Sequence, residues 1–262
     1  MKRSPEGSIG DLGAMFEGQR VGVVIPTYNE ARLLPVTLRG LPEFVDEVIV
    51  VDDGSRDESA AVAQQVAVTA PWRLELAMHQ ENRGVGGAIC TGYQRALTLN
   101  CALVVVVGAD AQMDPSEMGA LLTRLRKQGV DYVKGDRFAH PEASKRIPWL
   151  RRVGNQLLSA ATRRLTGDPT LSDAQCGYTA IRGETLRRLP LSALYPRYGF
   201  PNDLLIRLAE LGARVEQVPV TPIYGEERSK LSIPKVIIPL SLLLLRAALR
   251  RPWRHRARAA RS

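Results

Sequence analysis

The sequence has little cysteine and no apolar stretch long enough to cross a membrane. Its three cysteines, Cys90, Cys101 and Cys176, are too few and too scattered for a disulfide framework or a zinc site, and they fit a reducing compartment. The first twenty residues have no apolar core, so we expect no signal peptide and a flexible leader over residues 1–19. The apolar run 236–245 falls short of the ~20 residues that a spanning helix needs. These absences exclude a disulfide-rich secreted scaffold and indicate a cytoplasmic protein.

Acidic residues are also absent from the end of the chain. Residues 228–262 contain ten Lys or Arg and no Asp or Glu, whereas residues 1–227 hold 26 basic and 27 acidic residues. The net charge of +9 therefore belongs to the tail alone. Because a nucleic-acid-binding domain carries its basic face on the folded body, we expect no nucleic-acid partner.

In the tail, the basic residues follow the apolar run 236–245, which Lys235, Arg246 and Arg250 flank. An apolar run flanked by cations is typical of a membrane-surface anchor. The alternative is a C-terminal helix that packs on the body of the protein and is followed by a solvated basic tail. We expect residues 231–262 to form an amphipathic helix and a basic membrane-surface tail. The protein would then be peripheral, on the cytoplasmic face of the membrane.

An apolar strand, a polar turn and an amphipathic helix repeat in the first half of the chain. This alternation predicts parallel βαβ units in an α/β, Rossmann-like, doubly wound sheet. One such domain is expected over residues 20–230, and 262 residues are enough for it. The expected strands are 21–25, 48–51, 74–77, 103–107 and a last one at 213–220, with later helices at 153–165 and 202–211 and a mobile lid at 137–148.

The most informative stretch is 103–115. Its valines predict a strand buried on both faces, and Asp110, Gln112 and Asp114 follow in a short loop. Ligands of open α/β sheets bind beyond the carboxyl ends of the strands, and oxygen-bearing side chains suit Mg²⁺ or Mn²⁺ bound to a diphosphate. Asp114 fits a helix N-cap, because Pro and Ser-Glu follow it. For Asp110 and Gln112 we favour contact with a ligand.

The turn after the first predicted strand indicates which kind of nucleotide ligand the protein binds. The dinucleotide fingerprint should follow the first strand, but residues 26–30 are Pro-Thr-Tyr-Asn-Glu, and no Walker lysine loop is present. An acidic and aromatic turn there suits a nucleoside better than a triphosphate. Residues 55–58, Ser-Arg-Asp-Glu, predict a capping box at the start of the next helix.

Four motifs occur in order, each after its own predicted strand: Val23–Glu30, Val50–Ser55, Asn82–Gly84 and Ala109–Pro115. Together they resemble the family-two glycosyltransferases with the GT-A fold. Within that family the sequence is most similar to the dolichyl-phosphate and polyprenyl-phosphate sugar transferases, over about residues 20–230. The resemblance implies a nucleoside pocket, whose residues would be Pro26, Tyr28, Glu30, Asp52 or Asp53, Asn82 and Gly84.

The resemblance also implies a metal and a diphosphate site. Asp110 and Gln112 match the second acid and the glutamine of the family's metal motif, with Gly108 in place of the first acid. Asp110 would therefore serve catalysis by holding Mg²⁺ or Mn²⁺, with Gln112 and the diphosphate completing the shell. Lys230, in a Ser-Lys-Leu match, would neutralise the diphosphate.

The acceptor decides which further residues are needed. A lipid phosphate is already ionised and needs cations to guide it, for which Arg137 and Arg152 are candidates. A hydroxyl acceptor needs a general base, for which Asp203 and Asp173 are available, although either could serve as an N-cap or a loop hydrogen-bond acceptor. We expect an inverting transfer of a hexose from a GDP- or UDP-sugar to a polyprenyl phosphate. The alternatives are a family-two transferase acting on a soluble or glycan hydroxyl, and a non-catalytic nucleotide-sugar-binding protein.

Overall fold

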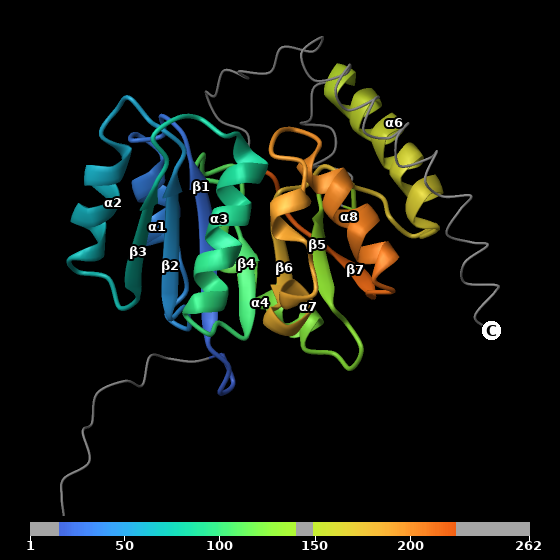
Figure 1. The fold of residues 1–262 in the computed structure, drawn as a ribbon, viewed down its shortest axis with the longest axis horizontal. Helices are drawn as coiled ribbons and strands as arrows, with labels where there is room; N and C mark the ends of the chain where they lie inside the picture. Colours follow the sequence, from blue (N-terminus) through green and yellow to red (C-terminus); the bar gives the residue numbers. More distant parts are fainter. Residues whose placement is uncertain (1–15, 140–148, 224–262) are drawn as a thin grey trace, which may run out of the picture.

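Within residues 16–139 and 149–223, which this computed structural model describes, seven strands form one sheet (Figure 1). The order is β3-β2-β1-β4-β6-β5-β7. Every neighbouring pair is parallel except the two that involve β6, which runs antiparallel to β4 and to β5. The expected mostly parallel sheet is confirmed. The strands are β1 (Val21–Thr27), β2 (Glu47–Asp52), β3 (Arg73–Met78), β4 (Leu103–Val106), β5 (Tyr132–Asp136), β6 (Thr179–Arg182) and β7 (Val215–Pro219).

The central strands form because their side chains are apolar on both faces. Along β1, Val23 and Ile25 enter the core on one side and Val24 enters the core on the other, as the two-residue period of a strand requires. Val104 and Val105 of β4 divide in the same way. A strand buried on both faces needs a helical layer on each side.

Those layers are present (Figure 1). Helices α1, α2 and α4 contribute to the core on one face of the sheet, and α3, α7 and α8 contribute to the core on the other. Helix α6 packs against α8. The helices are α1 (Leu34–Arg39), α2 (Ser59–Ala67), α3 (Val85–Thr98), α4 (Met118–Leu125), α6 (Trp149–Thr166), α7 (Gly183–Arg187) and α8 (Phe200–Glu210), with 3₁₀ turns η1 (Pro115–Glu117) and η2 (Leu191–Ala193).

Two capping predictions have opposite outcomes. Asp114 is the N-cap of η1, and its side chain accepts a hydrogen bond from the Ser116 amide at 2.9 Å. The capping box at 55–58 is wrong: α2 begins at Ser59, and its N-cap residue Glu58 makes no side-chain cap. Ser55 instead accepts a hydrogen bond from the Asn29 amide, so its hydroxyl joins two turns rather than starting a helix.

The ends of the domain differ in how much is described. Residues 16–19 form a turn on the body, where the Phe16 ring packs edge-on against Phe44 with centroids 4.9 Å apart. The rest of the expected leader, most of the expected lid (140–148) and the expected amphipathic helix and basic tail (231–262) lie outside the described residues. Among the helices that are described, none combines the length and apolar character needed to cross a bilayer.

Candidate functional site

The candidate site lies at the edge of the sheet where β1, β2, β4 and β5 end. These four strands run in the same direction, so the turns that follow them meet at one edge. Because β6 is antiparallel to β4 and β5, the loop before β6, residues 173–178, arrives at the same edge. The crevice beyond the carboxyl ends of the strands is where open α/β sheets bind ligands.

The turn after β1 is tied to the turn after β2. Asn29 adopts a left-handed conformation (φ 54°), which lets its amide reach Ser55 Oγ at 2.9 Å and its Oδ1 accept from the Arg56 amide at 2.8 Å. The Glu30 amide donates to Ser59 Oγ at 3.0 Å. Tyr28, directly before these anchored residues, is 39 % exposed. The backbone is therefore fixed while an aromatic face is left to solvent.

Asp52 and Asp53 are equally buried, at 3 % exposed, but they have different partners. Asp53 Oδ1 lies 2.7 Å from His79 Nδ1, and the same carboxylate accepts from the amides of Arg83 and Gly84, each at 2.8 Å. Asp52 Oδ1 accepts from the Ser55 amide at 2.7 Å, and its second oxygen has no hydrogen-bond partner among the described residues. Both oxygens of Asp53 thus hold the loop after β3, whereas only one oxygen of Asp52 has a hydrogen-bond partner among the described residues.

Gly84 is required where that loop enters α3. Its φ is +89°, and a Cβ there would lie 2.6 Å from the Pro196 carbonyl oxygen. The Gly87 amide donates to that same oxygen at 2.9 Å. Asn82 adjoins the turn after β2, because a Cβ at Gly54 would come within 3.1 Å of the Asn82 nitrogen. Asp52, Asp53, Asn82 and Gly84 are therefore brought together as one group.

The loop after β4 is built around Asp110. The Gln112 amide donates to Asp110 Oδ1 at 3.3 Å, and Ala111 between them is left-handed (φ 53°). A Cβ at Gly108 would lie 2.8 Å from Asp110 Oδ1, so the carboxylate lies over the position where a first acid would stand. Ile223 donates its amide to the Gln112 carbonyl at 2.8 Å. The described chain thus ends beside this loop.

The oxygen ligands at this loop are few. No cluster of three or more His, Cys, Asp or Glu that could hold a metal ion occurs in the part of the chain that the structure describes. Asp110 with Gln112 would still suit Mg²⁺ or Mn²⁺, because magnesium is commonly held by one or two carboxylates, waters and substrate phosphates rather than by a protein cage.

Arg137, which follows β5, forms an ion pair with the buried carboxylate of Asp173. Its Nε donates to Asp173 Oδ2 at 2.7 Å and its Nη2 to Oδ1 at 3.0 Å, and Oδ1 also accepts from the amides of Gln175 and Cys176. Burial alone would raise the pKa of Asp173, but the hydrogen bonds and charge of Arg137 outweigh burial and hold this pKa below its usual value. A carboxylate with a lowered pKa and occupied oxygens is a weak base.

Asp203 also has partners in the protein. It lies in the first turn of α8, where its Oδ2 accepts from the Tyr195 amide at 2.9 Å and its Oδ1 lies 3.6 Å from Arg207 Nε. This is the loop hydrogen bond considered as its alternative role. Arg152 lies half-buried near the start of α6, and Lys230 is outside the described residues.

Sequence reasoning missed Lys134, on β5, which was not predicted as a strand. Its side chain is 0 % exposed, and its Nζ donates to the Cys176 carbonyl in the loop before β6. Burial lowers the pKa of Lys134, while the nearby Cys176 and Asp173 oppose that shift. No local signal marks this residue, because its partner comes more than forty residues later.

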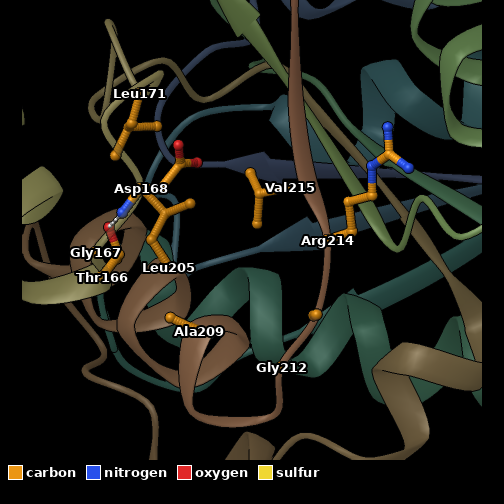
Figure 2. Close-up of a pocket in the computed structure, with 10 residues that line it drawn as sticks. Thr166, Gly167, Asp168, Leu171, Leu205, Ala209, Gly212, Arg214 and Val215 are labelled. Atoms are coloured by element: carbon orange, nitrogen blue, oxygen red, sulfur yellow. Dashed lines mark hydrogen bonds between the residues drawn. The ribbon is translucent and has the colours of Figure 1, made fainter.

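A cavity of about 330 Å³ lies away from this edge, where α8 ends and β7 begins (Figure 2). Leu171, Leu205, Arg214 and Val215 are among the residues that line it. Asp168, which also lines the cavity, accepts a hydrogen bond from the Thr170 hydroxyl at 2.6 Å. None of the expected site residues lines this cavity, so it is separate from the candidate site.

The fold and the edge define a class: an α/β protein whose ligand site combines a nucleoside-type turn, a buried acid pair and an oxygen-bearing loop suited to a diphosphate-bound cation. Within that class the chain belongs to glycosyl transferase family 2, whose model matches residues 22–189. It is a nucleotide-sugar-dependent glycosyltransferase, which sets aside the non-catalytic alternative.

Curated relatives support the narrower resemblance. The chain is 32 % identical to the polyprenol monophosphomannose synthase of Mycolicibacterium smegmatis over 219 residues, 82 % of each chain. It is 34 % identical to the undecaprenyl-phosphate mannosyltransferase of Micrococcus luteus over 205 residues, 77 % of this chain and 83 % of the relative.

A solved structure supports the GT-A fold. Glucosyl-3-phosphoglycerate synthase of Mycobacterium tuberculosis, in complex with Mn²⁺, UDP-glucose and phosphoglyceric acid, superposes with a TM-score of 0.65 at 23 % identity, covering 95 % of this chain and 85 % of that one. The expected fold class is therefore confirmed for the described sheet and helices.

Proposed function

We propose that this glycosyltransferase moves a hexose, with inversion, from a GDP- or UDP-sugar to a polyprenyl phosphate. The observation that carries the choice of acceptor is the state of the two candidate bases. Asp173 is held by Arg137 with a lowered pKa, and Asp203 is held by the Tyr195 amide and Arg207. An acceptor that is already an anion needs no general base, so a phosphate fits a site whose carboxylates serve structure. The curated relatives named above support the same acceptor class.

The donor would bind across the turns after β1, β2 and β3. Tyr28 offers an exposed aromatic face, with Pro26 and Glu30 near it in the chain, and one oxygen of Asp52 has no partner within residues 16–139 and 149–223. We assign the hydrogen bond to the base or ribose to Asp52 rather than to Asp53. Asn82 and Gly84 would complete the nucleoside pocket.

Asp110 and Gln112 would hold Mg²⁺ or Mn²⁺ at the loop after β4. The bound ion would neutralise charge on the departing nucleoside diphosphate. The solved relatives were crystallised with Mn²⁺ or Mg²⁺ together with UDP, which supports a divalent cation here. Lys230 would add positive charge to the same diphosphate.

The acceptor phosphate would be guided by Arg137 and Arg152. Asp173 fixes two nitrogens of the Arg137 guanidinium, so the orientation of that cation is set before a ligand arrives. The basic tail and the apolar run 236–245 would hold the protein at the cytoplasmic surface of the membrane, where a polyprenyl phosphate is found.

A soluble hydroxyl acceptor is the second candidate, because the solved relative was crystallised with phosphoglyceric acid. Full-length enzyme with Mn²⁺ should be offered labelled GDP- and UDP-hexoses with either a polyprenyl phosphate or 3-phosphoglycerate. Label that moves into the organic phase only when the polyprenyl phosphate is present is the expected result. Label found only in a water-soluble product would overturn the lipid acceptor while keeping the glycosyltransferase. Asp52→Asn is the matched variant and should weaken donor use with either acceptor.

A further inference from the structure

His79 joins three parts of the site and has no role in the function proposed above. It follows the last residue of β3 and is 8 % exposed. Its Nδ1 lies 2.7 Å from Asp53 Oδ1, and its Nε2 lies 2.9 Å from Thr91 Oγ1 on α3. Its backbone amide donates to the Asp52 carbonyl at 2.8 Å. The side chain therefore connects the end of β2 to the body of α3.

The chemistry of the partners assigns the protons. An ionised carboxylate only accepts hydrogen bonds, so Nδ1 carries a hydrogen and donates to Asp53. In the neutral ring Nε2 then accepts from the Thr91 hydroxyl. Thr91 thus donates a hydrogen bond to His79, and His79 donates one to Asp53. Asp53 in turn accepts from the amides of Arg83 and Gly84. The loop after β3 is thus held by a chain of hydrogen bonds that begins inside α3.

That loop needs such support. Gly84 is left-handed and lies against the Pro196 carbonyl, and the two amides that Asp53 accepts belong to consecutive residues of the loop. If Asp53 turned away, both amides would lose their partner and the loop could leave the pocket. A carboxylate is oriented by its partners, much as outer hydrogen bonds orient the ligands of a metal.

We propose that His79 is a positioning residue for the nucleotide-sugar donor. It orients Asp53, and Asp53 holds the Asn82–Gly84 loop in the conformation that receives the nucleoside. This inference rests on the donor site proposed above. Because His79 would act through Asp53 and not on the sugar or the diphosphate, its loss should weaken donor binding and leave the rate at saturation nearly unchanged.

Two substitutions that introduce an amide side chain test the roles of the two ring nitrogens of His79 separately. In His79→Asn the side-chain nitrogen falls near the position of Nδ1 and can still donate to Asp53. In His79→Gln it falls near Nε2, reaches toward Thr91 and leaves Asp53 without its donor. Thr91→Val removes the hydroxyl alone, and His79→Ala removes both contacts.

The test measures KM for the donor and kcat for the wild type and the four variants. Losing one hydrogen bond to a charged group should raise the donor KM roughly tenfold in His79→Ala and His79→Gln. His79→Asn should stay within about threefold of the wild type, and kcat should change by less than about twofold in every variant. A donor KM equal in all variants, or a fall in kcat with an unchanged KM, would overturn the proposal.

Hydrogen exchange at the Arg83 and Gly84 amides gives a second readout that needs no transfer. Exchange should be faster in His79→Ala and His79→Gln than in the wild type, and His79→Asn should restore slow exchange. If the wild type transfers no sugar, the proposed function fails while this comparison still reports on His79. If the wild type is active but these amides exchange alike in all variants, the positioning role is wrong. Should His79→Ala not fold, the pair His79→Asn and His79→Gln carries the same comparison.

Discussion

Arg137 and Asp173 are 36 residues apart in the chain and form a two-point ion pair at the carboxyl edge of the sheet. Nε and Nη2 of the arginine meet the two carboxylate oxygens at 2.7 and 3.0 Å. The pair joins the end of β5 to the loop that precedes β6. It therefore fixes both the arginine proposed to guide the acceptor and the loop opposite it.

Removing the carboxylate of this pair should destabilise the protein and change its response to acid. The pKa of Asp173 is lower in the folded state than in the unfolded chain, so its contribution is present above the unfolded value and is lost as pH falls through the folded value. Asp173→Asn should cost about 3–5 kcal/mol of unfolding free energy at neutral pH, because it removes the buried negative charge that pairs with the Arg137 guanidinium. Urea unfolding at several pH values below about 5 should show a flatter acid dependence than in the wild type. Glu58→Gln removes an exposed carboxylate and is the control; equal losses in both variants would contradict the assignment.

The metal site can be tested without an acceptor. Asp110→Ala should abolish the part of the thermal shift with GDP or UDP that depends on Mn²⁺, because Asp110 is the carboxylate proposed to hold the ion. Asp114→Ala is the matched control: Asp114 lies in the same loop, but its side chain caps η1 through the Ser116 amide. That variant should lower the melting temperature and keep the metal-dependent shift. A shift that persists unaltered in Asp110→Ala would remove this residue from the metal site.

Lys134 should give the protein a rise in stability at alkaline pH. Its folded pKa lies below the ordinary value of 10.5, so as pH rises the folded state releases this proton before the unfolded state does. The contribution of Lys134 to the unfolding free energy should therefore increase toward pH 10.5, so the unfolding free energy of the wild type should gain on that of Lys134→Met as pH rises. The two proteins are compared with each other at every pH, because buried cysteines and tyrosines with raised pKa values act in the opposite direction as pH rises past about 8.5 and about 10. Identical pH profiles for wild type and variant would show that Lys134 keeps its ordinary pKa.

Gly84 can be compared with a glycine that has the same backbone constraint and no close neighbour. Gly84→Ala should lose more stability than Gly129→Ala: both are left-handed (φ +89° and +78°), but a Cβ at Gly84 would meet the Pro196 oxygen at 2.6 Å and one at Gly129 would meet nothing within 4 Å. Strain alone should cost each variant about 1 kcal/mol, with a further cost at Gly84 from the contact. Chemical unfolding gives the two values, and donor KM should rise only in Gly84→Ala. Equal unfolding free energies for the two variants would mean that the backbone near Pro196 shifts to accommodate the added methyl group at no cost.

Three of the predicted strands that the structure confirms, β1, β2 and β4, have uninterrupted apolar runs that are buried on both faces. Their residues are contiguous in the chain, which makes such strands visible in the sequence. β3 and β7 also lie where they were expected, although Glu75 in β3 and Glu216 in β7 interrupt their apolar patterns. β5 was missed because Lys134 and Gly135 interrupt its apolar pattern. The lysine is tolerated there only because the Cys176 carbonyl, 42 residues later, accepts its hydrogen bond.

The sequence by itself determined the parallel half of the sheet, the positions of the motif-bearing turns and the family, because all three depend on residues close together in the chain. Only the tertiary structure decided that β6 runs antiparallel and brings Asp173 to the site. It also decided that Asp53 holds a loop while Asp52 keeps an open oxygen. A carboxylate can act as ligand, base or structural acceptor, and the choice depends on which donors surround it. Those donors, from His79 to Arg137, come from distant segments that only folding brings together.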